Sequence, residues 1–111
     1  MNTYQILFHG YGFDVVVDGE SGAISGFYTT RRIKAGSPEE AYLAALSSLK
    51  EEEKTKALMD ESLSNGGQPN FDAEHISEVS LLNRLFGRSP KGFIFYSDSE
   101  EPENESSNIP N

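Results

Sequence analysis

Few side chains in this chain are suited to chemistry. It has two histidines, His9 and His75, and no cysteine, which excludes disulfides, thiolate zinc sites and thiol nucleophiles. Together with one aspartate, Asp14 or Asp72, the histidines would form the two-histidine, one-carboxylate set that binds non-haem iron. Neither histidine lies in a spacing typical of metal ligands, and in a strand Glu74 and His75 would point to opposite faces. We therefore expect no metal and no cofactor.

The glycine-rich segment His9-Gly10-Tyr11-Gly12 could form a loop that holds a ligand. It lacks the third glycine and the helix start of a dinucleotide fingerprint, and no serine lies in a Gly-x-Ser-x-Gly elbow. An enzyme is neither indicated nor excluded. One open interpretation is a small enzyme or ligand-binding protein with its site at His9, Tyr11, Asp14 and Arg31, which requires a concave pocket where these side chains converge.

The segment Thr29–Lys34 contains three of the nine basic residues, Arg31, Arg32 and Lys34. Arginine forks bind carboxylates and phosphates, so these three residues are a candidate anion-binding site. The favoured alternative is a charged strand edge that resists aggregation and pairs with the acidic surface, because one strand does not supply converging donors. The three glutamates at 51–53 are sequential on an expected helix and should form a solvated face.

The segment Lys91-Gly92-Phe93-Ile94-Phe95-Tyr96 resembles the octapeptide of RNA-recognition motifs, but Ile94 occupies the position that should be Gly or Ala. A buried core strand explains it better. The formal charge of −9 opposes binding to phosphate backbones and anionic lipid, so we expect no nucleic-acid partner. No apolar run approaches the roughly 20 residues of a spanning helix, and we expect a cytoplasmic protein without membrane contact.

The strands must position these side chains. Residues 4–17 are rich in β-branched and aromatic types, which predicts a long strand bent or bulged at Gly10 and Gly12. Residues 23–35 predict a second strand that completes a hairpin. In it, one set of alternating positions contains Phe27 and Thr29, and the other contains Tyr28 and Thr30.

A helix is predicted to begin at Ser37-Pro38-Glu39-Glu40, which combines a serine cap, proline at the first position and a capping-box glutamate. Its apolar stripe weakens over residues 50–56, so either the helix bends or a second short helix begins near Lys54. Two further strands are predicted after the helix, near residues 73–79 and 92–96. We expect an α+β fold: an antiparallel sheet of about four strands, in ββαββ order, packed on one main helix.

At 111 residues the chain should form one compact domain, residues 1–97. Residues 98–111 contain five of the eighteen acids and no base, and should form an acidic disordered tail that contributes little to folding. Neighbouring positions such as Ile6 and Leu7 are both apolar, so the sheet needs cover on both faces. Residues 81–86 could cover the second face, but a second subunit is commoner, and we expect a homodimer.

The segments His9-Gly10, Gly26-Phe27-Tyr28-Thr29-Thr30-Arg31, Ser37-Pro38-Glu39-Glu40-Ala41 and Gly92-Phe93-Ile94-Phe95-Tyr96 give residues 4–97 a pattern. It resembles a family of small bacterial proteins of unknown function. The resemblance implies a bacterial origin and a compact α+β domain, and no particular chemistry. The two strands followed by Ser-Pro-Glu-Glu-Ala are also faintly similar to the first half of HicB-type antitoxin domains, although no DNA-binding segment follows.

The sequence thus favours a non-enzymatic binding or regulatory protein, of the inhibitor, antitoxin or immunity type. Thirteen acids and nine bases in residues 1–97 give a net −4, and the tail adds −5. The long-range field of such a protein attracts cationic surfaces and speeds their encounter. We expect the partner to be a basic macromolecule.

Overall fold

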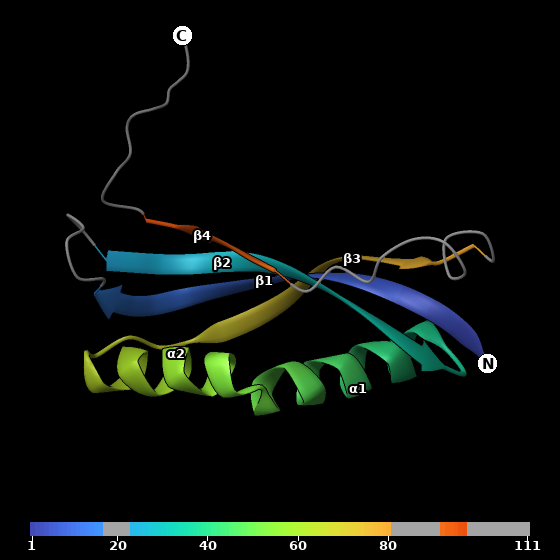
Figure 1. Ribbon diagram of the computed structural model, residues 1–111, viewed down its shortest axis with the longest axis horizontal. Coiled ribbons are helices and arrows are strands. Elements are labelled where there is room, and N and C mark those ends of the chain that lie inside the picture. The colour runs from blue at the N-terminus through green and yellow to red at the C-terminus, as the bar shows by residue number, and fades with distance from the viewer. Residues whose placement is uncertain (17–22, 81–91, 98–111) are drawn as a thin grey trace, which may run out of the picture.

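The computed structural model describes residues 1–16, 23–80 and 92–97. The elements are β1 (Asn2–Val16), β2 (Ala23–Ala35), α1 (Pro38–Glu51), α2 (Glu53–Ser64), β3 (Asn70–Glu78) and β4 (Phe93–Tyr96). The strands form one antiparallel sheet in the order β3-β1-β2-β4, and both helices lie on the same side of it (Figure 1). The predicted α+β class and the four-stranded antiparallel sheet are confirmed, but two helices stand where the predicted ββαββ order has one main helix.

The start and the break of the helical segment both have local causes. The Ser37 hydroxyl accepts a hydrogen bond from the Glu40 amide at 3.2 Å, and the Glu40 carboxylate accepts one from the Gly36 amide at 3.0 Å. The first bond confirms the predicted serine cap, whereas Glu40 binds the amide of the residue before the cap and not the Ser37 amide of a regular capping box. Glu52 is extended, with φ −65° and ψ 140°, so α1 ends before it and α2 begins after it. Of the two expected outcomes, a bend or a second helix, the second is the one observed.

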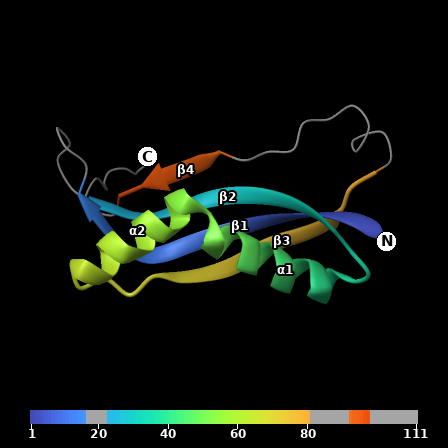
Figure 2. The ribbon, with the colours of Figure 1, turned by 60° about the horizontal axis from the view of Figure 1, so that its bottom comes forward.

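The core lies between the helices and one face of the sheet (Figure 2). Alternate residues of β1 point toward the helices, and they pack on small or aliphatic side chains of α1. The buried residues of this cluster are Tyr4, Ile6, Phe8, Ala35, Ala41, Ala45 and Leu49. Phe8 and Leu49 are fully buried, and each such side chain contributes about 1.5–3 kcal/mol relative to exposure in water.

The expected irregularity of β1 occurs at Gly12 and not at Gly10. Gly12 has a φ of +77°, and the pairing of β1 with β2 shifts register between Tyr11 and Val15. A Cβ atom at Gly12 would overlap the carbonyl oxygen of Gln68. Gly10 keeps regular pairing, opposite Phe27, so a bend at that position was a wrong prediction. Its lack of a side chain instead makes room for the Phe27 ring, which a Cβ would contact at 2.6 Å.

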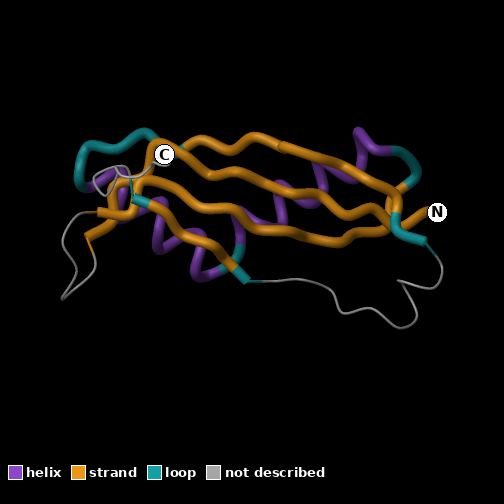
Figure 3. The backbone as a smooth tube through the Cα atoms, turned by 90° about the horizontal axis from the view of Figure 1, so that it is seen from above, coloured by secondary structure: helices purple, strands orange, loops and turns teal. Residues whose placement is uncertain are grey.

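The second face of the sheet is turned away from both helices, and Figure 3 looks onto it. Among the residues that the structure describes, no helix or strand covers this face. Residues 81–86 and the tail 98–111, for which we made predictions, lie outside the described residues. No helix in the described part of the chain is long and apolar enough to cross a membrane.

Candidate functional site: the open face of the sheet

We call the uncovered side of the sheet the open face. It is built from the alternate residues of β1 that do not point toward the helices, and from their partners on the neighbouring strands. In register, His9 lies opposite Tyr28 of β2 and Asp72 of β3. The other side chains of this face follow the same alternation: Gln5, Leu7 and Tyr11 of β1, Thr30 and Arg32 of β2, and Ile94 and Tyr96 of β4.

His9 is at the centre of a cluster of three tyrosines. Its ring stacks on Tyr28 with 4.5 Å between centroids and an interplanar angle of 12°. The rings of Tyr11 and Tyr96 lie 5.5 Å and 5.7 Å from it. The Nε2 atom of His9 is 2.6 Å from the Tyr96 hydroxyl oxygen, and its Nδ1 atom is 3.4 Å from the Glu74 carboxylate. His9 therefore contacts residues from all four strands.

The order of these groups sets the direction of the hydrogen bonds. A carboxylate beside Nδ1 favours the tautomer that carries its proton there, so Nε2 accepts a hydrogen bond from the Tyr96 O–H. The phenol, the imidazole and the carboxylate thus lie in sequence, with a hydrogen bond between Tyr96 and His9 and a longer electrostatic contact between His9 and Glu74. A hollow of about 250 Å³ on this face lies toward β4 and is lined by Leu7, Tyr28 and Ile94 among others, without His9.

Glu74 reaches His9 because β3 contains a β-bulge. His75 pairs with Leu7 and Ala73 pairs with Phe8, which leaves Glu74 as the extra residue. Bulges interrupt strand alternation and redirect a side chain. The expectation that Glu74 and His75 point to opposite faces is therefore wrong, because the bulge brings Glu74 to the open face, where His75 also lies opposite Leu7.

Two of the four residues of the candidate small-molecule site come together. His9 and Tyr11 are neighbours on the open face. Asp14 of β1 lies beside the last turn of α2, and its backbone amide donates a hydrogen bond to the Ser62 hydroxyl at 3.0 Å. Arg31 lies on the helix side of the sheet and binds Glu52. Only His9 and Tyr11 are therefore close to one another, and Asp14 and Arg31 lie in two other regions of the protein.

The three basic residues of β2 do not converge either. The Nε and Nη2 atoms of Arg31 donate to the two carboxylate oxygens of Glu52, at 2.9 Å and 2.8 Å. Arg32 donates to the side chain of Gln5 at 2.8 Å, and Lys34 is exposed. β4 pairs with β2 only from Gly26 to Thr29, so among the described residues the basic segment beyond Thr29 has β1 as its one neighbouring strand, which agrees with its interpretation as a charged strand edge. Glu52 was expected on a solvated face of a helix, and its pairing with Arg31 was not predicted. It reaches Arg31 because it lies at the break between α1 and α2.

In the described ranges, no three histidine, aspartate or glutamate side chains are grouped closely enough to hold a metal ion. Comparisons of the chain with protein-family models, with curated proteins and with solved structures find no match. The geometry of the open face is therefore the basis on which a function can be proposed.

Proposed function

We propose that this protein is a non-catalytic binding protein, of the inhibitor, antitoxin or immunity type, that engages a basic macromolecular partner through its open face. The observation that supports this most is the tyrosine cluster around His9, which stands uncovered beside the carboxylates of Asp72 and Glu74. Tyrosine is enriched at protein interfaces and at their energetic hot spots. We place the complex in a bacterial cytoplasm.

The cluster has the properties of an anchor for a partner. The stack of His9 on Tyr28 and the hydrogen bond from Tyr96 restrain these rings before binding, so ordering them costs little conformational entropy. Beside them, Ile94 is 71% exposed and offers apolar surface that a partner can bury. The flanking carboxylates favour a cationic partner and raise the rate of encounter.

A capture experiment with a matched pair of variants tests this proposal. Ile94→Lys places a charge in the open face, whereas Leu63→Lys makes the same change at a 59%-exposed position on α2. We expect the wild type and Leu63→Lys to retain a basic protein from extracts of the source cells, and Ile94→Lys to lose it. Recovery of acidic proteins alone, or equal recovery by both variants, would contradict the proposal.

The second candidate function is a small enzyme or ligand-binding protein. The observation that favours it is the position of the His9 imidazole between the Tyr96 hydroxyl and the Glu74 carboxylate. It predicts that a small molecule remains bound when the protein is purified. Native mass spectrometry should then detect an added mass that is absent from a His9→Gln variant. A single unliganded mass for the wild type would count against this function.

A further inference from the structure

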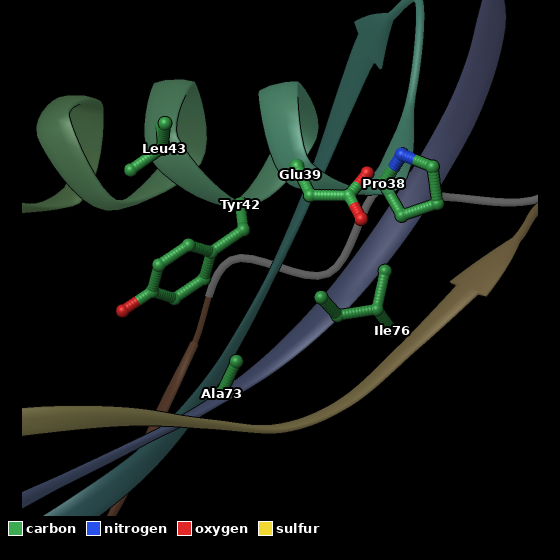
Figure 4. A pocket seen from close by; sticks show the side chains of 6 residues that line it. All are labelled: Pro38, Glu39, Tyr42, Leu43, Ala73 and Ile76. Atoms are coloured by element: carbon green, nitrogen blue, oxygen red, sulfur yellow. The ribbon is translucent and has the colours of Figure 1, made fainter.

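A groove runs between α1 and β3, on the helix side of the molecule (Figure 4). Its volume of about 540 Å³ lies within the range of about 300–1,000 Å³ for ligand sites. The groove is mostly apolar, with one carboxylate near the first turn of α1. Its lining consists of Pro38, Glu39, Tyr42, Leu43, Ala73 and Ile76. Leu43 is 63% exposed and offers apolar surface at the border of the groove.

The strand that forms one wall of this groove is an edge of the sheet. Within the described residues β3 pairs with β1 alone, so its outer side has no strand partner. An edge of this kind is a template for an added strand. When an extended peptide pairs with such an edge, alternate side chains enter the groove beside it and supply specificity.

The side chains of β3 indicate which residues a paired strand would carry on each of its faces. Ala73 and Ile76 point into the groove, whereas Asp72 and Glu74 belong to the open face. Side chains of paired strands meet their neighbours on the same face. A matching peptide would therefore place apolar side chains toward α1 and basic side chains toward Asp72 and Glu74.

We propose that the α1–β3 groove binds an extended segment of alternating apolar and basic residues, which pairs with the outer edge of β3 as a fifth strand. This inference rests on the proposed function, because it assigns the segment to the basic partner already proposed. The open face and the groove meet along β3, so one partner can contact both. The bulge at Glu74 interrupts regular pairing and limits the added strand to a short segment.

A second copy of this chain fits the edge poorly. β3 contains Asp72, Glu74 and Glu78 and no lysine or arginine. Pairing β3 with β3 of another copy would bring carboxylates together along one face, and like charges on paired strands are destabilising. The occupant is therefore a chain of opposite charge.

The test uses the full chain, labelled with ¹⁵N, and a synthetic nine-residue peptide that alternates leucine and lysine. We expect amide shifts in β3 and in the first half of α1, and a dissociation constant at least tenfold weaker for Leu43→Lys. Leu63→Lys is the matched control, since it adds the same charge at a similarly exposed leucine outside the groove, and should change affinity less than twofold.

Two further peptides separate strand addition from general attraction. A version with N-methyl groups at alternate positions cannot donate backbone hydrogen bonds and should bind at least tenfold more weakly, and a leucine–glutamate version should not bind. Equal binding of the N-methylated peptide, shifts confined to the open face, or self-association abolished by Leu43→Lys would overturn the inference. If Ile94→Lys loses the captured partner while these peptide results are negative, the proposed function stands and only the groove assignment fails.

Discussion

The Nε2 atom of His9 lies 2.6 Å from the hydroxyl oxygen of Tyr96, and this hydrogen bond joins β1 to β4 across the intervening strand β2. β4 has four residues and, in the part of the chain that the structure describes, pairs with β2 alone. The contact therefore fixes the position of an edge strand as well as the orientation of the imidazole. The proposed function depends on both effects, because it requires side chains that are ordered before binding.

Removing this hydrogen bond should lower stability without changing the fold. We expect Tyr96→Phe to lower the free energy of unfolding by about 1 kcal/mol, the usual net value for one hydrogen bond. Tyr11→Phe is the control, because no hydrogen bond of the Tyr11 hydroxyl is found among the described residues. Urea denaturation measures both. Equal losses for the two variants would show that the bond to His9 is not what stabilises β4.

Gly12 and Gly66, the glycines with positive φ in the described ranges, should respond differently to alanine. Gly66→Ala meets only backbone strain, because at φ +91° a Cβ would have no heavy atom within 4 Å, and it should cost about 1–2 kcal/mol. Gly12→Ala adds an overlap with the carbonyl oxygen of Gln68 and should cost about 3 kcal/mol or more. Thermal unfolding of both variants checks the order. The reverse order would mean that the loop after α2 does not pack on β1 as described.

Replacing Arg31 by lysine should weaken its bidentate ion pair with Glu52. The Arg31 guanidinium also lies 5.2 Å from the centre of the Phe93 ring, so it links the helix break to β4. Lysine can supply neither the paired hydrogen bonds nor the planar stack, and we expect Arg31→Lys to cost about 1–2 kcal/mol. A double-mutant cycle with Glu52→Gln, followed by urea denaturation, measures the coupling. A coupling energy near zero would contradict this role.

Local features of the sequence predicted the fold, whereas contacts between distant residues had to be observed. The start of α1 follows from Ser37 to Glu40, because a serine cap acts within one turn. His9 and Tyr96 are 87 positions apart, and their contact depends on a strand order that no local pattern encodes. Glu74 was missed for another reason, since a single-residue bulge leaves the hydrophobic pattern of β3 almost unchanged.

The homodimer expected from the sequence stays a prediction, and the open face is the surface concerned. A second copy on this face would bury Leu7 and Ile94, and a basic partner would then have to displace it. Light scattering at micromolar concentration should give the mass of a dimer for the wild type and of a monomer for Ile94→Lys. A monomer mass for the wild type would refute the dimer and leave the open face free for the partner.

The most direct test of the central claim places a photo-reactive benzoylphenylalanine at position 94 in the open face, with position 63 on α2 as the control. Cross-linking in the source cells followed by mass spectrometry identifies what lies against each position. We expect a basic protein joined to position 94 and absent from position 63, with a yield that falls when extracts are cross-linked above about 0.15 M salt, because the screening length then shortens to roughly 8 Å. Cross-links from position 94 only to acidic proteins other than a second copy of this chain, or the same products from both positions, would refute the proposed basic partner.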